Sequence, residues 1–568
     1  MQVLALLIAL LSCSHQVRIV APTALRPRIA HEAKAKDYMV TTQGGATTRA
    51  ALSMFSRGGN IIDAFVAASF TISVERPHST GIGGGGFLLF YNRAENKVYS
   101  FDFREIAPVM ATKNMYLTSK GDTQPLLSQE GALAVATPGL VRGLYEIHSK
   151  FGKLPWAETL APAIKLASEG FPLYDQLQEA ITDREHLLKL DPEAKVIFFT
   201  ADGKVPLLGS LIIQPTLAQT FKIIAREGAK GFYEGEVASK IVKTVASKRG
   251  ILSHKDLREY QMKERAPVTG EFHGLKIYSM PPPSSGGIHV IQILKMLEPH
   301  NLKAKGPQST ETVHLTALAM QRAFLDRAQY LGDPDFHAVP VKSLLNDKYL
   351  KTLSENINRP TAIPAGDMRP VPLPYESSDT THFTIGDKDG NLVASTQTIN
   401  GWFGSAVIAQ GTGIILNNEM DDFAQKVGVQ NLFGAVGGQN NLVEPKKRPL
   451  SSMSPTIILN EDGPYMALGS PSGTRIITCV AQTILNSIEF GMPLYEAVAA
   501  TRVHQQWQPD QLKIESPFLD PKVEKELEAK GHHVIHEGLG CSIQAIRREN
   551  NSWIGVSDPR GEGLAQGQ

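Results

Sequence analysis

Hydroxyl side chains gather on both arms of one predicted hairpin in the last third of the 568-residue chain. Lys388-Asp389-Gly390 has the composition of a three-residue hairpin loop, with Gly at the left-handed position. This loop pairs Asp387 with Asn391. Carried back along both strands, the same register places Thr380 opposite Thr398, with about 5 Å between their Cβ atoms.

The two faces of this hairpin differ in character. Alternation along the strands predicts a core face made of Phe383, Ile385, Val393 and Ile399. The other face carries hydroxyl and polar side chains, namely Thr380, His382, Thr384, Thr396, Thr398 and Asn400. On this pattern alone a solvated sheet face is the simpler interpretation, because Thr is common in strands.

Three further stretches supply groups that a hydroxyl nucleophile could use. "LNNEMDDF" (416–423) places three carboxylates after an apolar run, and "KRPLSSMSP" (447–455) places a serine pair before a predicted strand. "GSPSGTRIITCVAQTIL" (469–485) is a Gly/Ser turn at the start of a helix, where backbone amides point outward and can bind an anion. Together these groups predict acyl transfer through a hydroxyl nucleophile.

Both helices and strands are predicted to position these groups. Residues 46–55 and 61–74 have the apolar spacing of helices, and Asn60 has a side chain that can cap the second one. Amphipathic helical patterns continue through most of the middle of the chain. After residue 381 strands and tight turns prevail, with one long helix predicted over 475–489. Helical and β-rich parts of one large chain predict layers of both kinds.

Two stretches near the N-terminus need a choice between interpretations. "TGIGGGGFLLFY" (80–91) formally contains a dinucleotide-binding fingerprint, but here it follows a helix and opens a strand, the reverse of what that motif requires. Its glycines instead predict a close approach of backbone to a neighbouring group. In "FDFREIAP" (101–108), an ion pair of Arg104 with Asp102 or Glu105 is the simplest interpretation.

Composition and the chain start narrow the class of protein. A net charge of +1 gives no reason to expect a nucleic acid or a membrane surface as partner. Residues 3–11 are apolar but too few for a bilayer span of roughly 20 residues. With the small residues after them they predict an export signal over residues 1–24. "LLSC" (10–13) also resembles a lipoprotein cleavage site, so lipid anchoring at Cys13 is an alternative.

Neither the remaining cysteines nor the histidines predict a cross-link or a metal. Cys479 lies in an apolar run, which favours a buried free thiol over a disulfide with Cys541. In "GHHVIH" (531–536), strand alternation separates His533 from its neighbours, and no Cys or carboxylate cluster with ligand spacing lies nearby.

In this order, "TGIGGGGF", "FDFREIAP", "TTHFTIGDKDGN", "NNEMDDF", "KRPLSSMSP" and "GSPSGTR" resemble the motifs of the γ-glutamyltranspeptidases. The resemblance covers nearly the whole chain after the signal. It implies an α+β fold, the four-layer αββα sandwich of the N-terminal-nucleophile hydrolases, made as an inactive proenzyme. Self-cleavage between Asp379 and Thr380 would give a large subunit (25–379) and a small subunit (380–568), intertwined in one domain.

The resemblance also implies catalytic roles. Thr380 would be the nucleophile, with its new α-amino group as base and Thr398 as its hydrogen-bond partner. The backbone amides of Ser472 and Gly473 would form the oxyanion hole. The family often has Gly at position 472, an exchange that matters only if the turn requires a positive φ there.

The implied substrate-binding side chains form two groups. The α-carboxylate of a γ-glutamyl group would be held by Arg104, Ser451 and Ser452. Its α-amino group would be held by Asp422, Asn400 and Glu419. A carboxylate facing Arg and an ammonium facing acids are electrostatically favourable. In the lid loop (424–438), Phe433 stands where bacterial relatives often carry Tyr.

The implied activity is cleavage of the γ-glutamyl amide of glutathione and related compounds through a γ-glutamyl-threonyl ester. The γ-glutamyl group would pass to water or to amino-acid or peptide acceptors. No cofactor, metal or nucleic acid is implied, the protein would be periplasmic or secreted, and a membrane enters only through lipidation at Cys13. Two alternatives stay open: a glutaryl- or cephalosporin-type acylase on the same fold, and a non-enzymatic exported binding protein. The complete set of γ-glutamyl recognition residues favours the γ-glutamyl enzyme over the acylase. The intact pair of Thr380 and Thr398 favours both enzymes over the binding protein.

Overall fold

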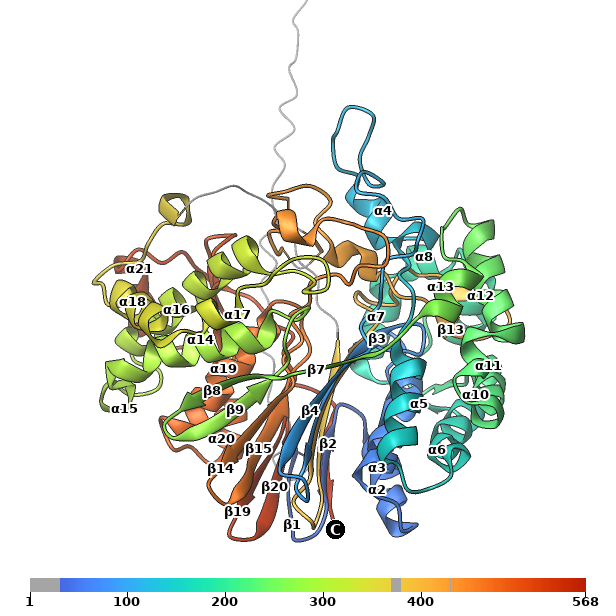
Figure 1. Ribbon diagram of the computed structural model, residues 1–568, viewed down its shortest axis with the longest axis horizontal. Coiled ribbons are helices and arrows are strands. Elements are labelled where there is room, and N and C mark those ends of the chain that lie inside the picture. Colours follow the sequence, from blue (N-terminus) through green and yellow to red (C-terminus); the bar gives the residue numbers. More distant parts are fainter. Residues whose placement is uncertain (1–30, 369–379, 430, 433) are drawn as a thin grey trace, which may run out of the picture.

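Two stacked sheets flanked by helices make up this computed structural model (Figure 1). The structure describes residues 31–368, 380–429, 431–432 and 434–568. The predicted export signal, Cys13, Asp379 and Phe433 lie outside the described residues.

Each sheet has seven antiparallel strands. The first runs in the order β1 (Glu32–Ala35), β20 (Ser552–Ser557), β19 (Gln544–Glu549), β15 (Gly463–Gly469), β14 (Thr456–Asn460), β9 (Leu275–Ser279) and β8 (Val268–Phe272). The second runs in the order β21 (Leu564–Gly567), β2 (Met39–Thr42), β10 (Thr381–Gly386), β11 (Leu392–Thr398), β3 (Gly85–Asn92), β4 (Lys97–Asp102) and β7 (Lys263–Arg265). Each sheet thus combines strands from both sides of residue 380, as an intertwined domain requires.

Helices cover the outer face of each sheet (Figure 1). On the side of the first sheet lie α14 (Gly286–Leu297), α16 (Thr310–Tyr330), α17 (Val341–Leu344), α18 (Asp347–Ile357), α19 (Arg475–Ile488) and α20 (Leu494–Ala499). On the side of the second lie α2 (Gly45–Ser56), α3 (Ile61–Glu75), α5 (Leu140–Phe151), α6 (Trp156–Glu169), α10 (Pro215–Glu227), α11 (Lys230–Tyr233), α12 (Gly235–Ser247) and α13 (His254–Glu259). The predicted four-layer αββα arrangement is confirmed.

Smaller elements connect these layers. The remaining helices are α4 (Pro125–Gln129), α7 (Asp175–Asp183), α8 (Glu185–Leu188), α9 (Pro192–Phe198), α15 (Leu302–Lys305) and α21 (Pro521–Ala529). The remaining strands are β5 (Phe171–Pro172), β6 (Leu211–Ile212), β12 (Ile408–Ala409), β13 (Ile414–Ile415), β16 (Val503–His504), β17 (Leu512–Ile514) and β18 (Val534–His536). No helix of the described residues is long and apolar enough to cross a membrane.

Local predictions for the helices hold. Asn60 caps α3 through its side chain, and Asp63 completes a capping box by accepting from the Asn60 amide at 2.7 Å. Every residue of α3 is buried, because this helix lies between the second sheet and other helices. The long helix predicted over 475–489 is α19.

The register of the central hairpin is as predicted. Thr381 pairs with Gln397, and Gly386 pairs with Leu392. The pairing confirms that Thr380, directly before β10, stands opposite Thr398 at the end of β11. The loop composition was sufficient to predict this register, because a three-residue loop with Gly at a positive φ fixes which residues of the two strands face each other.

The prediction of a solvated hydroxyl-rich face is wrong. Phe383 and Ile385 lie in the core beneath α3, as expected, but the opposite face is buried as well. There Thr384 Oγ1 lies 2.6 Å from Thr41 Oγ1, and the ring of His382 packs against the backbone of Gly469 in the other sheet. Strand alternation cannot show that a second sheet covers the polar face.

The prediction of a free thiol at Cys479 is also wrong. Cys479 on α19 and Cys541, just before β19, form a disulfide although they are 62 positions apart in sequence. The apolar surroundings of Cys479 are as expected. They carry no information about which distant segment packs against α19.

Burial of His382 makes stability depend on pH. Its Nδ1 lies 2.8 Å from Thr396 Oγ1, and burial lowers the pKa of His382 to about 3. The unfolded chain takes up this proton near pH 6.5 and the folded chain does not, so stability falls as the pH drops below about 6.5. Between pH 7.5 and pH 5, His382→Gln should lose about 2 kcal/mol less unfolding free energy than its parent. Urea titrations in a Thr380→Ala background keep the unfolding chain single.

The exposed His533 provides the matched control. His533→Gln should follow the pH dependence of the parent. If the unfolding free energy of His382→Gln depended on pH as that of its parent does, His382 would take up its proton in the folded protein as readily as in the unfolded chain.

Candidate active site

One pocket between the layers collects the chemistry predicted from the sequence. It is lined by Arg104, Arg327, Thr380, Thr398, Asn400, Glu419, Asp422, Asn431, Ser451, Ser452, Met453, Gly473, Thr474 and Ile476. Every predicted site residue within the described part of the chain lies in this lining except Ser472. Its free space is only about 20 Å³.

The threonine pair stands at the end of the central hairpin. Thr380 and Thr398 are both buried and both face the pocket. Thr398 Oγ1 accepts a hydrogen bond from the amide of Asn400 at 2.8 Å, which fixes this hydroxyl against the turn after β11. Asn400 has a φ of 75°, and its Nδ2 donates to the carbonyl of Asn418 at 3.0 Å. The hairpin end is thereby connected to the acidic turn.

Close backbone packing holds the acidic turn in place. Asn417 donates from Nδ2 to the carbonyl of Gly83 at 2.7 Å, and its Oδ1 accepts from the amide of Glu419 at 3.0 Å. A Cβ at Gly83 would overlap the carbonyl of Ile415, and one at Gly84 would overlap the carbonyl of Thr398. The close approach predicted for the glycine-rich stretch is confirmed, and it places the segment before β3 against both Thr398 and Ile415.

Arg104 pairs with neither of the acids beside it in sequence. Its guanidinium donates to Glu419 and to Asp422, and it is 1% exposed. The only contact of Asp102 with Arg104 is a hydrogen bond that Asp102 accepts from the Arg104 backbone amide at 3.0 Å. The Asp102 carboxylate forms ion pairs with Arg265 and Arg448. The local ion-pair interpretation was therefore wrong, because distant carboxylates are closer in the fold.

Burial raises the free energy of ionising the carboxyl groups in this cluster. Burial raises the pKa of Glu419, and the Arg104 charge opposes that shift. Burial also raises the pKa of Asp422, again against the attraction of Arg104. The Glu105 carboxyl is fully buried, and burial together with the nearby Glu419 raises its pKa well above the usual range. The carboxyl groups of Glu105, Glu419 and Asp422 thus all bind a proton more readily than exposed carboxyl groups, and Arg104 opposes this tendency.

The serine pair forms the opposite wall. The amide of Ser451 donates to the carbonyl of Pro283 at 2.9 Å, so the segment lies along the loop before α14. Ser452 Oγ accepts a hydrogen bond from Arg327 Nη2 at 3.1 Å. Sequence reasoning missed Arg327, because an arginine in an amphipathic helix is usually exposed. It also missed Asn431, whose Nδ2 donates to Asp422 at 2.9 Å.

The Gly/Ser turn before α19 reaches the pocket through one of its two predicted residues. Gly473 lines the pocket, whereas the Ser472 side chain turns away and donates to the carbonyl of Leu539. Within the described part of the chain, neither the Ser472 nor the Gly473 amide donates a hydrogen bond. Ser472 has a φ of 103°, so the condition under which a serine at this position matters is met.

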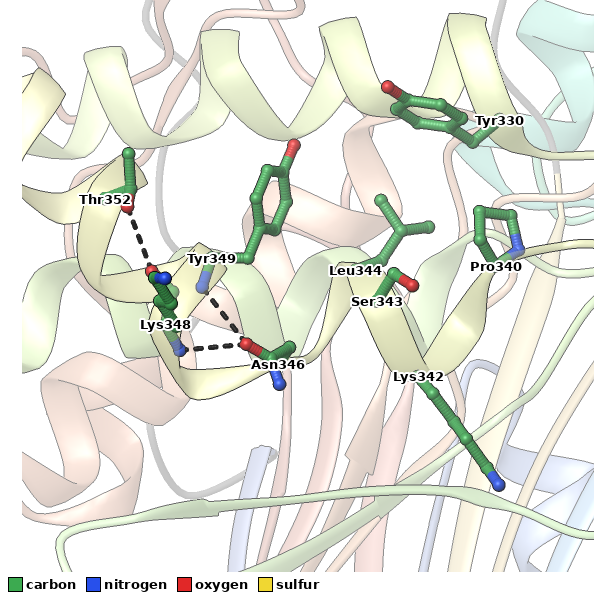
Figure 2. A pocket seen from close by; sticks show the side chains of 9 residues that line it. All are labelled: Tyr330, Pro340, Lys342, Ser343, Leu344, Asn346, Lys348, Tyr349 and Thr352. Atoms are coloured by element: carbon green, nitrogen blue, oxygen red, sulfur yellow. Dashed lines mark hydrogen bonds between the residues drawn. The ribbon is translucent and has the colours of Figure 1, made fainter.

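A larger cavity lies elsewhere. About 680 Å³ in volume, it opens between Tyr330 of α16 and the residues of α17 and α18, as Figure 2 shows. The described lining includes Lys342 and Lys348 but no carboxylate, and it shares no residue with the pocket around Thr380. Size alone therefore does not identify the active site here.

Comparison with known proteins decides the family. The model of the family described as Gamma-glutamyltranspeptidase matches residues 47–568. The chain belongs to the γ-glutamyltranspeptidase family. It is 40% identical to the glutathione hydrolase proenzyme of Escherichia coli (strain K12) over 533 residues, 93% of this chain and 91% of that protein. It is 41% identical to the glutathione hydrolase proenzyme of Pseudomonas aeruginosa, covering 94% of this chain and 96% of that protein.

Solved structures agree on the fold of the family. The cephalosporin acylase of Bacillus halodurans matches with a TM-score of 0.83 at 26% identity, covering 97% of this chain and all of that one. The γ-glutamyltranspeptidase of Helicobacter pylori matches with a TM-score of 0.56 at 38% identity, covering 58% of this chain and 93% of that one. The architecture is that of the N-terminal-nucleophile hydrolases.

The positive φ of Ser472 predicts different effects of two small substitutions. Gly adopts this conformation without the roughly 1–3 kcal/mol of strain that other residues bear. Both Ser472→Gly and Ser472→Ala lose the bond to Leu539, so Ser472→Gly should be more stable than Ser472→Ala by about 1 kcal/mol. Ser472→Gly should keep kcat within about tenfold of wild type, because it retains the backbone amide that the resemblance assigns to the oxyanion hole, whereas losing such a donor costs about 10²–10³. Thermal unfolding and initial-rate assays of both variants are the measurements. Equal stability of the two would show that the turn is not strained.

Proposed function

We propose that this chain is a self-processing γ-glutamyl hydrolase and transferase that acts on glutathione and related γ-glutamyl compounds. The observation that carries the proposal is that one pocket is lined by the threonine pair, by two arginines and by two carboxylates. A γ-glutamyl group has a carboxylate and an ammonium on one carbon, and this lining offers partners of the opposite charge to each.

Maturation would begin with Thr380. Its hydroxyl attacks the carbonyl of Asp379, the peptide nitrogen leaves as the α-amine of Thr380, and water then hydrolyses the resulting ester. The products are a large subunit ending at Asp379 and a small subunit of residues 380–568. The free amine, with an ordinary pKa of about 7.7–8, becomes the base for its own hydroxyl.

Turnover would use the same hydroxyl. Thr380 Oγ attacks the γ-carbonyl while its α-amine takes the proton, and the amides of Ser472 and Gly473 stabilise the oxyanion. The proton then passes to the departing amine, which leaves a γ-glutamyl-threonyl ester. Water or the amine of an amino acid or peptide attacks this ester and regenerates Thr380. Thr398 positions the nucleophile throughout.

Recognition would rearrange the charges of the empty pocket. Arg104 is bound to Glu419 and Asp422, so an incoming ammonium competes with Arg104 for these acids. The substrate carboxylate in turn offers a new partner to the cationic side, with hydroxyl donors from Ser451 and Ser452. Exchange of one set of charge pairs for another costs less than stripping isolated charges of water.

We further propose export through the N-terminal segment, into the periplasm or the medium. The apolar run of residues 3–11 supports a signal, and the "LLSC" sequence leaves anchoring at Cys13 as the alternative. The Cys479–Cys541 disulfide fits an oxidising compartment.

Self-cleavage is tested by Thr380→Ala. The wild-type protein should separate on a denaturing gel into two chains, the smaller beginning Thr-Thr-His-Phe. Thr380→Ala should remain one chain without amidase activity, because the attacking oxygen is gone. Thr381→Ser, a change at the adjacent buried threonine, should still be processed. A different N-terminus of the small chain would rule out Thr380 as the nucleophile.

Substrate class is tested with paired p-nitroanilides. A glutaryl anilide has the reacting carbonyl but lacks the α-amino group, so its binding leaves Asp422 without that partner. A charged hydrogen bond contributes roughly 1.5–3 kcal/mol, and stranding a charge costs more. The γ-glutamyl anilide should therefore be preferred by on the order of 10²-fold in kcat/KM.

Asp422→Ala should remove most of this preference by slowing the γ-glutamyl reaction, whereas a change at the exposed Asp389 should not. Faster cleavage of the glutaryl anilide by the wild type would favour the acylase alternative instead.

A further inference from the structure

A glutamine behind the pocket holds the residue that follows the Gly/Ser turn. Thr474 lines the pocket directly after Gly473, and its hydroxyl donates to Oε1 of Gln506 at 2.6 Å. Gln506 lies after β16, 32 positions later in the chain, and is not among the described lining residues. Thr474 stands at the N-cap position of α19 but makes no side-chain capping bond there. Its hydroxyl instead attaches the turn to the segment after β16.

The side-chain amide of Gln506 is fully used. Its Oε1 also lies 2.9 Å from Nε2 of His504, and its Nε2 donates to the carbonyls of Gly434 and Gln508, each at 3.2 Å. A glutamine amide has two acceptor positions on its oxygen and two N–H donors on its nitrogen. Because all four are occupied, the side chain is held in one orientation, with its oxygen toward Thr474.

The backbone beside Gln506 is held in an unfavourable conformation. Trp507 has a φ of 71°, and its side chain is buried. A bulky residue in the left-handed region bears strain, which persists only where the surrounding structure holds the backbone in place. The fold therefore fixes both the backbone of this segment and the side chain that reaches Thr474.

The Gly/Ser turn is consequently held at both of its ends. Ser472 donates to the carbonyl of Leu539, and Thr474 donates to Gln506. Donors that stabilise a developing oxyanion are most effective when their positions are fixed before the reaction, because the protein then spends no free energy on reorganising them. A hydrogen bond at each end of the turn meets this requirement for the amides of Ser472 and Gly473.

We propose that Gln506 is a positioning residue of this reaction, which accepts the Thr474 hydroxyl and thereby holds the Ser472 and Gly473 amides in the geometry that stabilises the oxyanion. The proposal rests on the proposed function, which gives those amides that role. Gln506 acts through Thr474 and not by contact with the substrate. Its loss is therefore expected to lower kcat while KM changes little, since the oxyanion forms only in the transition state.

The test compares the same substitution at two adjacent buried glutamines. Gln505 and Gln506 are 3% and 4% exposed. Gln506→Met removes the acceptor of Thr474, whereas Gln505→Met removes a bond from Gln505 Nε2 to Asp510 at 3.1 Å. With L-γ-glutamyl-p-nitroanilide, Gln506→Met should lower kcat about tenfold and leave KM within about threefold of wild type. Gln505→Met should keep the wild-type kcat, and thermal unfolding records any loss of stability separately.

A double-mutant cycle shows whether Gln506 acts through Thr474. Thr474→Val removes the hydroxyl with little change of shape and should lower kcat by a similar factor. In Gln506→Met/Thr474→Val the two losses should not multiply, because both substitutions break the same hydrogen bond. Losses that multiply, or a Gln505→Met variant that loses as much kcat as Gln506→Met, would overturn the assignment.

Processing into two chains is checked first for each variant. Where Gln506→Met is not processed, Thr474→Val provides the comparison with Gln505→Met, because it breaks the same bond from the other end. If neither is processed, the bond is a requirement of maturation and the positioning role is overturned. A wild type that does not cleave the anilide would count against the proposed function itself, whatever the variants do.

Discussion

The contact of Arg104 with Glu419 and Asp422 determines the geometry of the pocket. Arg104 comes from the segment after β4, and its partners lie 315 and 318 positions later, in the turn after β13. Because all three side chains are nearly inaccessible to water, losing one of them would leave an uncompensated buried charge. The segment after β4 and the turn after β13 are therefore held together by this ion pairing. A ligand that enters the pocket must interact with the charges of Arg104, Glu419 and Asp422.

That contact depends on backbone segments that approach more closely than side chains would allow. At Gly83 and Gly84 the chain passes against the carbonyls of Ile415 and Thr398, where no Cβ would fit. Asn417 donates from Nδ2 to the carbonyls of Gly83 and Ala136, which connects the acidic turn to both segments. The glycine-rich stretch thus permits backbone packing that side chains would prevent. It sets the spacing between the threonine pair and the acidic turn.

A second pair of connections fixes the turn that leads into α19. Ser472 donates to the carbonyl of Leu539, and two residues later Cys541 forms a disulfide with Cys479 on the same helix. The segment around residue 540 is thereby attached to α19 at two points. One connection holds the strained residue of the turn, and the other holds the helix that follows it.

The sequence by itself determined the features that depend on near neighbours. The loop at Lys388 fixed the register that places Thr380 opposite Thr398, and Asn60 marked the start of α3. The glycines of residues 81–86 predicted a close approach to neighbouring backbone. The motifs also identified the residues that the fold gathers into one pocket. The described lining includes each predicted residue that the structure resolves apart from Ser472.

Only the tertiary structure decided which surfaces meet. It buried the hydroxyl-rich face under a second sheet, paired Cys479 with Cys541, gave Arg104 distant partners, and brought Arg327 beside Ser452. The physical reason is that hydrogen-bonding and turn preferences act over a few residues and are written in the local sequence. Burial, charge pairing and cross-links depend on segments hundreds of positions apart, whose contacts exist only once the layers have packed.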